Sequence, residues 1–556
     1  MRLRDDARDR ALVLHKQGDL TAAEAGYRQI LATHPDEGAT WHLLAVLMGQ
    51  RGDHNSAAEY CRRALLNGYR AVETYANLAA ALSKSGSTFE AAEAAQEGLD
   101  IATTNSTLKI ELVRQLRAGG FERSAFRSLS DLEKYDPDDR AILNELAQCS
   151  IQLGSYPYAK RALTRLSRLE PGAAEHKLNL SLTHFMGGEK ELAAMASRES
   201  IAIEPDLYPG YYLLTKTIRL SKNDPIATDI VLKATSARGL KSPELQFAAG
   251  NLHHGFGDFD AAFTFYKRGN SLVRRSMNYG IAEDERRLSV IASQIDGLTS
   301  APLPDIDYRD VRHRPVFIVG MPRTGSTLLE SMMTRYPDIT SAGEMVWMQR
   351  LVRASLTENQ LTFPEGMAHL PDSALAKIRS DYSKLLAENV PVSGTGKESI
   401  CIDKLPGNLL YIPLILRVFP ESRIIITTRD RASTCLSCFI QLFSSTQQFA
   451  YDLHEASRFW EAHMEIIRSA ESTAGSWVSS VKLADLLQEP QKTLDGLLAF
   501  CGAERDADLA SADYSSDDGL FRTASALQIR ASKVDPLENL RRYHHLLPSE
   551  LVSAHT

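Results

Sequence analysis

The sequence predicts an α-helical solenoid followed by a three-layer α/β domain with a central parallel sheet. Two observations carry this prediction. In the first half of the 556-residue chain, glycine recurs at a constant step, which is typical of a repeat architecture. In the second half, short apolar runs alternate with helical segments, and the first run leads into a glycine-rich turn, which is typical of an α/β domain.

Three residue types define the repeat. Glycine recurs every 34 residues, alanine follows at a distance of five, and proline follows four of the glycines at a distance of 17. Glycine suits a tight turn because it accepts positive φ, alanine lets the second helix pack closely on the first, and proline stops that helix. The members are Gly18, Gly52, Gly86, Gly120, Gly154 and Gly188; Ala23, Ala57, Ala91, Ala125, Ala159, Ala193, Ala227 and Ala261; and Pro35, Pro137, Pro171 and Pro205.

This pattern resembles tetratricopeptide repeats, and the segment GDLTAAEAGYRQILATHPDE at 18–37 matches it closely. The resemblance implies about eight units over residues 1–275, forming a right-handed solenoid with a concave groove. Such an array has no catalytic chemistry of its own, and we expect its groove to bind an extended protein or peptide. Assembly of the chain into a homodimer is the alternative role. A further helix and a linker occupy 276–310, so the second domain is expected at 311–556.

Composition narrows the class of protein. A net charge of −7 argues against general nucleic-acid binding, which needs a basic balance. No apolar run approaches the roughly 20 residues of a membrane helix, so we expect no integral membrane segment. Six cysteines are too few for a disulfide scaffold, and a cytoplasmic location is the expectation.

The second domain opens with a predicted phosphate-binding loop. The apolar run at 315–319 is followed by GMPRTGST at 320–327 and then by a helical segment. This order aims backbone N–H groups and a helix N-terminus at an anion. The spacing matches a Walker A loop, but Ser326 stands where that loop has lysine, which argues against a kinase acting on ATP and Mg²⁺. Arg323 offers a positive charge from inside the loop.

The loop resembles the 5′-phosphosulfate loop of sulfotransferases that use 3′-phosphoadenosine 5′-phosphosulfate (PAPS), in the form of tyrosylprotein sulfotransferases and bacterial tetratricopeptide-linked sulfotransferases. The segments RIIITTRDRASTCLSCFIQ at 423–441 and TASALQIRASKVDPLENLRRY at 523–543 resemble that family's 3′-phosphate motif and cofactor-closing loop. The resemblance implies a P-loop-like sulfotransferase domain, adenosine 3′,5′-bisphosphate as product, and no metal. Its cofactor-binding residues would be Pro322, Arg323, Thr324, Gly325, Ser326, Thr327, Arg429, Ser437, Ser525, Arg530 and Lys533.

The catalytic residues follow from the same resemblance. DKLPGN at 403–408 resembles a family segment whose lysine lies near the sulfuryl group, which indicates Lys404. In the tyrosylprotein type the general base is a glutamate about 21 residues beyond the loop arginine, and here that residue is Glu344. Small-molecule sulfotransferases use histidine instead, and His369 is the one histidine between the two nucleotide motifs. Glu344 and His369 are therefore both candidates for the general base.

These observations predict a PAPS-dependent sulfotransferase. Its acceptor would be a hydroxyl of a protein, of a peptide such as one containing tyrosine, or of another large molecule held by the repeat groove. The competing hypothesis is a non-enzymatic interaction protein whose transferase domain binds nucleotide or is inert. The combined presence of Arg323, Arg429, Ser437, Lys404 and Glu344 favours the enzyme, because an inert domain has no need of all five.

Overall fold

The computed structural model describes residues 2–101, 106–300, 313–390, 399–443, 447–503 and 541–552. The chain divides into two compact units, residues 1–162 and 163–556, and each is described by itself. The predicted domain division at 275 and 310 follows the repeat pattern and stays a prediction. No helix in these described ranges is long and apolar enough to cross a membrane.

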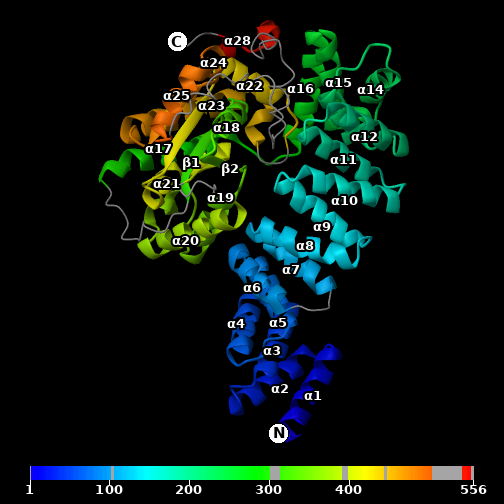
Figure 1. Ribbon diagram of the computed structural model, residues 1–556, viewed down its shortest axis with the longest axis vertical. Helices are drawn as coiled ribbons and strands as arrows, with labels where there is room; N and C mark the ends of the chain where they lie inside the picture. Colours follow the sequence, from blue (N-terminus) through cyan, green and yellow to red (C-terminus); the bar gives the residue numbers. More distant parts are fainter. Residues whose placement is uncertain are drawn as a thin grey trace. The chain divides into compact units, whose positions relative to one another are not determined.

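The first unit is built of paired helices, coloured blue to cyan in Figure 1. Each predicted turn glycine up to Gly154 has positive φ, between 68° and 94°, and so does Gly188 in the second unit, at 82°. The space beside Gly18, Gly52 and Gly86 is open, so backbone conformation and not crowding requires glycine there. The helices are α1 (Arg2–Lys16), α2 (Leu20–Thr33), α3 (Gly38–Gln50), α4 (His54–Leu66), α5 (Val72–Lys84), α6 (Thr88–Ile101), α7 (Ser106–Gly119), α8 (Glu122–Tyr135) and α9 (Arg140–Gln152), with α10 (Tyr156–Leu169) spanning the division.

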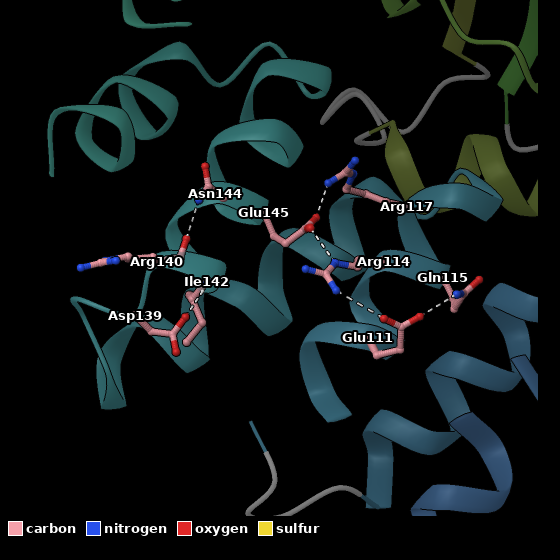
Figure 2. A network of polar contacts seen from close by, with 9 residues as sticks. All are labelled: Glu111, Arg114, Gln115, Arg117, Asp139, Arg140, Ile142, Asn144 and Glu145. Carbon is pink, nitrogen blue, oxygen red and sulfur yellow. Dashed lines mark hydrogen bonds and ion pairs between the residues drawn. The ribbon is translucent and has the colours of Figure 1, made fainter. Parts of the chain in front are cut away.

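A buried carboxylate links two helices of the first unit (Figure 2). Glu145 on α9 accepts a hydrogen bond from Arg114 Nε of α7 at 2.8 Å and forms a second ion pair with Arg117. Arg114 also reaches Glu111 at 3.4 Å. Glu145 is only 9% exposed, so its charge is compensated by the two guanidinium groups in place of water. The network therefore ties together the first helices of successive repeats.

The second unit continues the helical pairs and then adds the α/β domain. The 34-residue series shifts by one residue in the last pair, where Gly257 has a φ of 79° and Ala262 is fully buried, whereas Ala261 is not. The earlier repeat alanines from Ala23 to Ala227 are at most 3% exposed. The helices are α11 (Ala174–Met186), α12 (Lys190–Ile203), α13 (Tyr208–Thr217), α14 (Pro225–Thr235), α15 (Pro243–Phe256), α16 (Phe259–Arg275) and α17 (Ile281–Asp296).

A five-stranded, all-parallel sheet forms the centre of the α/β domain, in the order β2-β3-β1-β4-β5. Successive residues of β1 face opposite sides. Val316 and Ile318 pack with α18 and α25, whereas Phe317 packs on Tyr382 of α20 and on Phe419. Helices therefore cover both faces, which confirms the predicted fold class. The elements are β1 (His313–Gly320), α18 (Ser326–Met333), β2 (Ile339–Gly343), α19 (Trp347–Glu358), α20 (Asp372–Asn389), β3 (Ser399–Lys404), α21 (Ile412–Val418), β4 (Arg423–Thr428), α22 (Arg431–Phe439), α23 (Leu453–Ala474), β5 (Val478–Lys482), α24 (Leu483–Gln488), α25 (Pro490–Phe500) and α28 (Ser549–Val552).

The last repeat helices share one hydrophobic core with the α/β domain. Phe247 of α15 and Tyr266 of α16 belong to the same buried cluster as Leu436 of α22. Polar contacts reinforce it, since Asn270 Nδ2 donates to Phe439 O at 2.8 Å and Arg274 Nε forms an ion pair with Glu455 at 2.7 Å. Buried apolar surface of this kind is the main favourable contribution to folding. These repeat helices therefore form part of the hydrophobic core of the α/β domain.

Candidate functional site

The candidate residues gather at one edge of the sheet. In a parallel sheet the carboxyl ends of all strands lie at the same edge, and ligands bind there. The glycine loop follows β1, Glu344 follows β2, Lys404 is the last residue of β3, and Arg429 follows β4. The pairing of Ile318 with Lys404 and of Gly320 with Thr427 brings these strand ends level with one another.

The loop at 320–325 requires both of its outer glycines. Gly320 has a φ of 141°, and a Cβ there would lie 2.5 Å from Thr427 O. Gly325 has a φ of 100° and precedes α18, and a Cβ there would lie 2.7 Å from Leu483 Cδ1. Between them, Thr324 Oγ1 donates to Met321 O at 2.7 Å and lies 2.7 Å from Thr427 Oγ1. The loop therefore passes tightly over the end of β4 before the helix begins.

Arg323 and the residues after β4 form the first polar group of the site. Arg323 has a φ of 71°, in the left-handed region, and its Nε donates to Ser437 Oγ on α22 at 3.1 Å. Arg429 Nη1 donates to Arg323 O at 3.3 Å, and Trp460 Nε1 donates to Arg429 O at 3.2 Å. Burial lowers the pKa of Arg323. Residues from two motifs more than 100 positions apart are thus joined directly.

Pro322, Ser326 and Thr327 complete the described part of the predicted nucleotide contacts. Pro322 O accepts a weak hydrogen bond from Cys438 Sγ at 3.7 Å. Ser326 and Thr327 are the first two residues of α18 and are 7% and 5% exposed. Ser525, Arg530 and Lys533 lie outside the described residues.

Lys404 is the centre of the second polar group. Its side chain is fully buried, its Nζ donates to Glu344 Oε1 at 2.5 Å, and Glu330 Oε2 lies 3.4 Å away. Burial acts to lower the pKa of Lys404, but Glu330 and Glu344 outweigh it, so the pKa is raised and the amine stays charged. The Glu344 side chain is 42% exposed, so it is the member of the group that a solvent-borne molecule can reach.

Sequence reasoning missed Glu330. It lies on α18, accepts a hydrogen bond from Ser341 Oγ at 2.6 Å, and holds the second side of the Lys404 ammonium. A single carboxylate inside the apolar segment LLESMM was a signal that a buried cation lies nearby, because buried charges need partners.

Asp403, beside Lys404, was also missed as a supporting residue. It is fully buried, accepts from Tyr382 OH at 2.7 Å and accepts from Asn408 Nδ2 at 3.0 Å. Burial, with Glu330 nearby, raises the pKa of Asp403 to about 7, although the two hydrogen bonds act in the opposite direction. Asp403 thus anchors the end of β3 to α20.

His369, the alternative base, forms no ion pair with the Lys404 group in the part of the chain that the structure describes. It ends a short 3-10 helix, Glu365–His369, and is exposed. None of the hydrogen bonds in the described residues joins it to Lys404 or Glu344. In the same described ranges, no group of three or more His, Cys, Asp and Glu side chains comes together as metal ligands would. The expectation of a metal-free reaction stays a prediction.

Family models match a part of each of the two regions. A family model described as the sulfotransferase family matches residues 315–507, and one described as the tetratricopeptide repeat matches residues 8–76. An uncharacterized protein of Aquifex aeolicus (strain VF5) is 26% identical over 306 residues, which is 52% of this chain and 38% of that protein. A Caenorhabditis briggsae protein with the provisional name protein-tyrosine sulfotransferase is 27% identical over 119 residues, 21% of this chain and 39% of that protein.

The chain spans about two fifths of the length of these curated relatives. Among solved structures, the sulfotransferase domain from the Synechococcus PCC 7002 olefin synthase is 18% identical, with a TM-score of 0.26, and the match covers 44% of this chain and 100% of that domain. By the family models, the chain thus has a segment that matches the tetratricopeptide repeat at 8–76 and a segment that matches the sulfotransferase family at 315–507.

Proposed function

We propose that the protein is a PAPS-dependent sulfotransferase that moves a sulfuryl group to a hydroxyl of a protein, a peptide or another large acceptor. One observation carries the proposal. The buried Lys404 and the exposed Glu344 meet at the sheet edge where the glycine loop and the Arg323–Ser437 pair also lie. In this proposal, the loop and the Arg323–Ser437 pair bind the nucleotide, and Lys404 and Glu344 supply the catalytic groups.

The chemistry of the loop fits the phosphate groups of such a donor. Gly320 and Gly325 let the loop lie tightly against Thr427 and Leu483 just before α18, and the N-terminus of such a helix favours an anion. Arg323, Arg429 and Ser437 supply a cationic and hydroxyl donor set that suits phosphate oxygens. When bound, the donor would supply the sulfuryl group that is transferred and leave as adenosine 3′,5′-bisphosphate.

Glu344 is the proposed general base. An acceptor hydroxyl has a pKa of about 10 or higher, so it attacks well only if its proton is removed as its oxygen bonds to sulfur. Glu344 has the exposed carboxylate and therefore takes that proton. With the donor bound, Lys404 would supply positive charge to stabilise the phosphate oxygen that becomes negative when the sulfuryl group leaves it.

Glu330 is the proposed positioning residue for this pair. If Glu344 turns toward an acceptor, Lys404 loses one carboxylate, and a buried ammonium without a partner would be costly. Glu330 Oε2, 3.4 Å from Lys404 Nζ, keeps the amine charged and in place while Glu344 turns away. The arrangement therefore lets Glu344 move while Lys404 stays.

The repeats are the proposed acceptor-binding region. Tetratricopeptide repeats present a concave surface to extended partners, which suits a protein or peptide acceptor, and a homodimer interface is the other use of the same surface. We also propose a cytoplasmic location, because the six cysteines are buried free thiols, as in a reducing compartment.

Glu344→Gln tests the proposal. It keeps the shape and removes the basicity, so it should lower kcat by about 10²–10⁴-fold. Affinity for adenosine 3′,5′-bisphosphate should stay nearly unchanged in calorimetry, while adenosine 5′-monophosphate should bind far more weakly to both proteins. Turnover is followed as sulfate adducts that appear by mass spectrometry when a lysate is incubated with PAPS and the protein. Glu358→Gln, on the exposed end of α19, is the matched control.

Two outcomes would contradict the proposal. If His369→Ala loses turnover and Glu344→Gln does not, the histidine is the base and Glu344 has no catalytic role. If the unmodified protein yields no sulfate adduct and binds the bisphosphate no better than the monophosphate, the domain is an inert or merely nucleotide-binding part of an interaction protein.

A further inference from the structure

A lysine of the repeat region reaches the residues beside the candidate phosphate site. Lys216 lies in the last turn of α13, and its Nζ donates to Gln441 Oε1. Gln441 follows α22 and lies four residues beyond Ser437, one helical turn along the chain. The contact joins a repeat helix to the segment that carries a predicted 3′-phosphate ligand.

The environment of Lys216 is held rigidly. Gln441 Nε2 donates to Tyr212 OH at 3.0 Å, and the backbone N–H of Leu442 donates to the same hydroxyl at 3.3 Å. Tyr212 lies four residues before Lys216, on the same face of α13. The amide of Gln441 is therefore oriented so that its oxygen, and not its nitrogen, faces the lysine.

The charged group that acts on Lys216 is itself positive, the guanidinium of Arg323. Burial and the nearby Arg323 guanidinium lower the pKa of Lys216 to about 7. Arg323 also acts on the Tyr212 hydroxyl, and burial raises the pKa of that tyrosine. The direct partner of the lysine is a neutral amide, and the face of the Tyr212 ring, with its centroid 6.0 Å from Nζ, gives the charged amine only weak support. Among the described residues, no carboxylate forms an ion pair with it. A methionine or glutamine would fill the same space without the cost of burying an amine beside a guanidinium.

We propose that Lys216 is a ligand for an anionic group of the nucleotide donor, the group also held by Arg323 and Ser437, so that the repeat region supplies one wall of the donor site. The inference rests on the proposed function, because it takes the Arg323–Ser437 pair to hold that donor. A negatively charged phosphate or phosphosulfate oxygen beside Arg323 would offset the positive charge that now acts on Lys216. The Lys216 amine would then become protonated and donate a hydrogen bond to that oxygen. The repeats would then take part in the site directly, and not only hold the acceptor.

The test measures the binding of adenosine 3′,5′-bisphosphate to the full-length protein by calorimetry at pH 8, in buffers of different ionisation enthalpy. At this pH the phosphates are already fully ionised, and an amine with a pKa of about 7 is mostly neutral before binding. The unmodified protein should therefore take up about one proton on binding. Lys216→Met should abolish that uptake and weaken affinity about 10- to 100-fold, the usual effect of removing a hydrogen bond to a charged group.

Controls separate this role from a structural one. Lys216→Arg should keep most of the affinity but show no proton uptake, because an arginine stays charged. Lys267→Met removes an exposed lysine from α16 and should change neither quantity.

Three results would overturn the assignment. Equal affinity and equal proton uptake in Lys216→Met would show that the lysine does not meet the ligand, while the proposed function would stand. Lost affinity with unchanged proton uptake would show a purely structural role. No binding of the bisphosphate to the unmodified protein would remove the proposed function and this assignment with it.

Discussion

Replacing Asp403 by asparagine should change how stability depends on pH. Asp403 is fully buried at the end of β3, and its pKa is raised from 3.8 to about 7, chiefly by burial. Between these two pH values the folded protein holds a proton that the unfolded chain has released. Stability therefore falls as pH rises through this window, and the penalty is complete above the folded pKa. Asparagine carries no such proton and removes this contribution.

The magnitude follows from the two pKa values. Each pKa unit corresponds to about 1.4 kcal/mol, so the penalty is about 2 kcal/mol at pH 5 and about 4 kcal/mol at pH 8. The stability of Asp403→Asn relative to the unmodified protein should thus increase by about 2–3 kcal/mol between pH 5 and pH 8. Only this change with pH is predicted, because the amide also alters the hydrogen bonds to Tyr382 and Asn408 by an amount that does not depend on pH.

Urea unfolding followed by tryptophan fluorescence is a suitable assay. Trp347 lies edge-on to Tyr382 at 6.0 Å, so its emission reports the region that Asp403 anchors. Asp131→Asn removes the same charge from an exposed helix face and serves as control. A difference between Asp403→Asn and the unmodified protein that stays constant within about 1 kcal/mol from pH 5 to pH 8 would refute the reasoning.

Further predictions concern the repeats and the loop. Glu145→Gln leaves Arg117 facing a neutral amide and should destabilise the first unit by about 1–3 kcal/mol in thermal unfolding, whereas Glu111→Gln, at 45% exposure, should cost less than about 1 kcal/mol. Gly320→Ala would place a Cβ 2.5 Å from Thr427 O on a backbone of positive φ. It should therefore lower the free energy of unfolding by about 1–3 kcal/mol and abolish bisphosphate binding in calorimetry. Gly407→Ala, which has open space around its Cβ, should do neither, and equal behaviour of the two glycine variants would contradict the steric argument.

The sequence alone was sufficient for the architecture, because local preferences and period decide it. The 34-residue step predicted the helical pairs, and the positive φ of Gly18 to Gly188 follows from what glycine alone allows. The strict 34-residue step predicted Ala261 for the last pair, whereas the structure uses Gly257 and Ala262. One inserted residue displaces both positions and leaves the spacing between them unchanged. The apolar run at 315–319 lies within β1, directly before the glycine-rich turn.

Contacts between distant segments were decided only by the tertiary structure. Arg323 and Ser437 were predicted separately from their motifs, but their direct hydrogen bond depends on how β1 and β4 lie side by side. Glu330 belongs to no motif, and it contacts Lys404 because α18 packs beside β3. Lys216 belongs to no motif either, and its contact with Gln441 also depends on tertiary packing. Charge pairing and burial depend on distances through space, which residue spacing along the chain does not specify. The sequence therefore determined the fold and the motif residues, whereas tertiary packing decided which residues they contact and how the last repeat helices pack on the α/β domain.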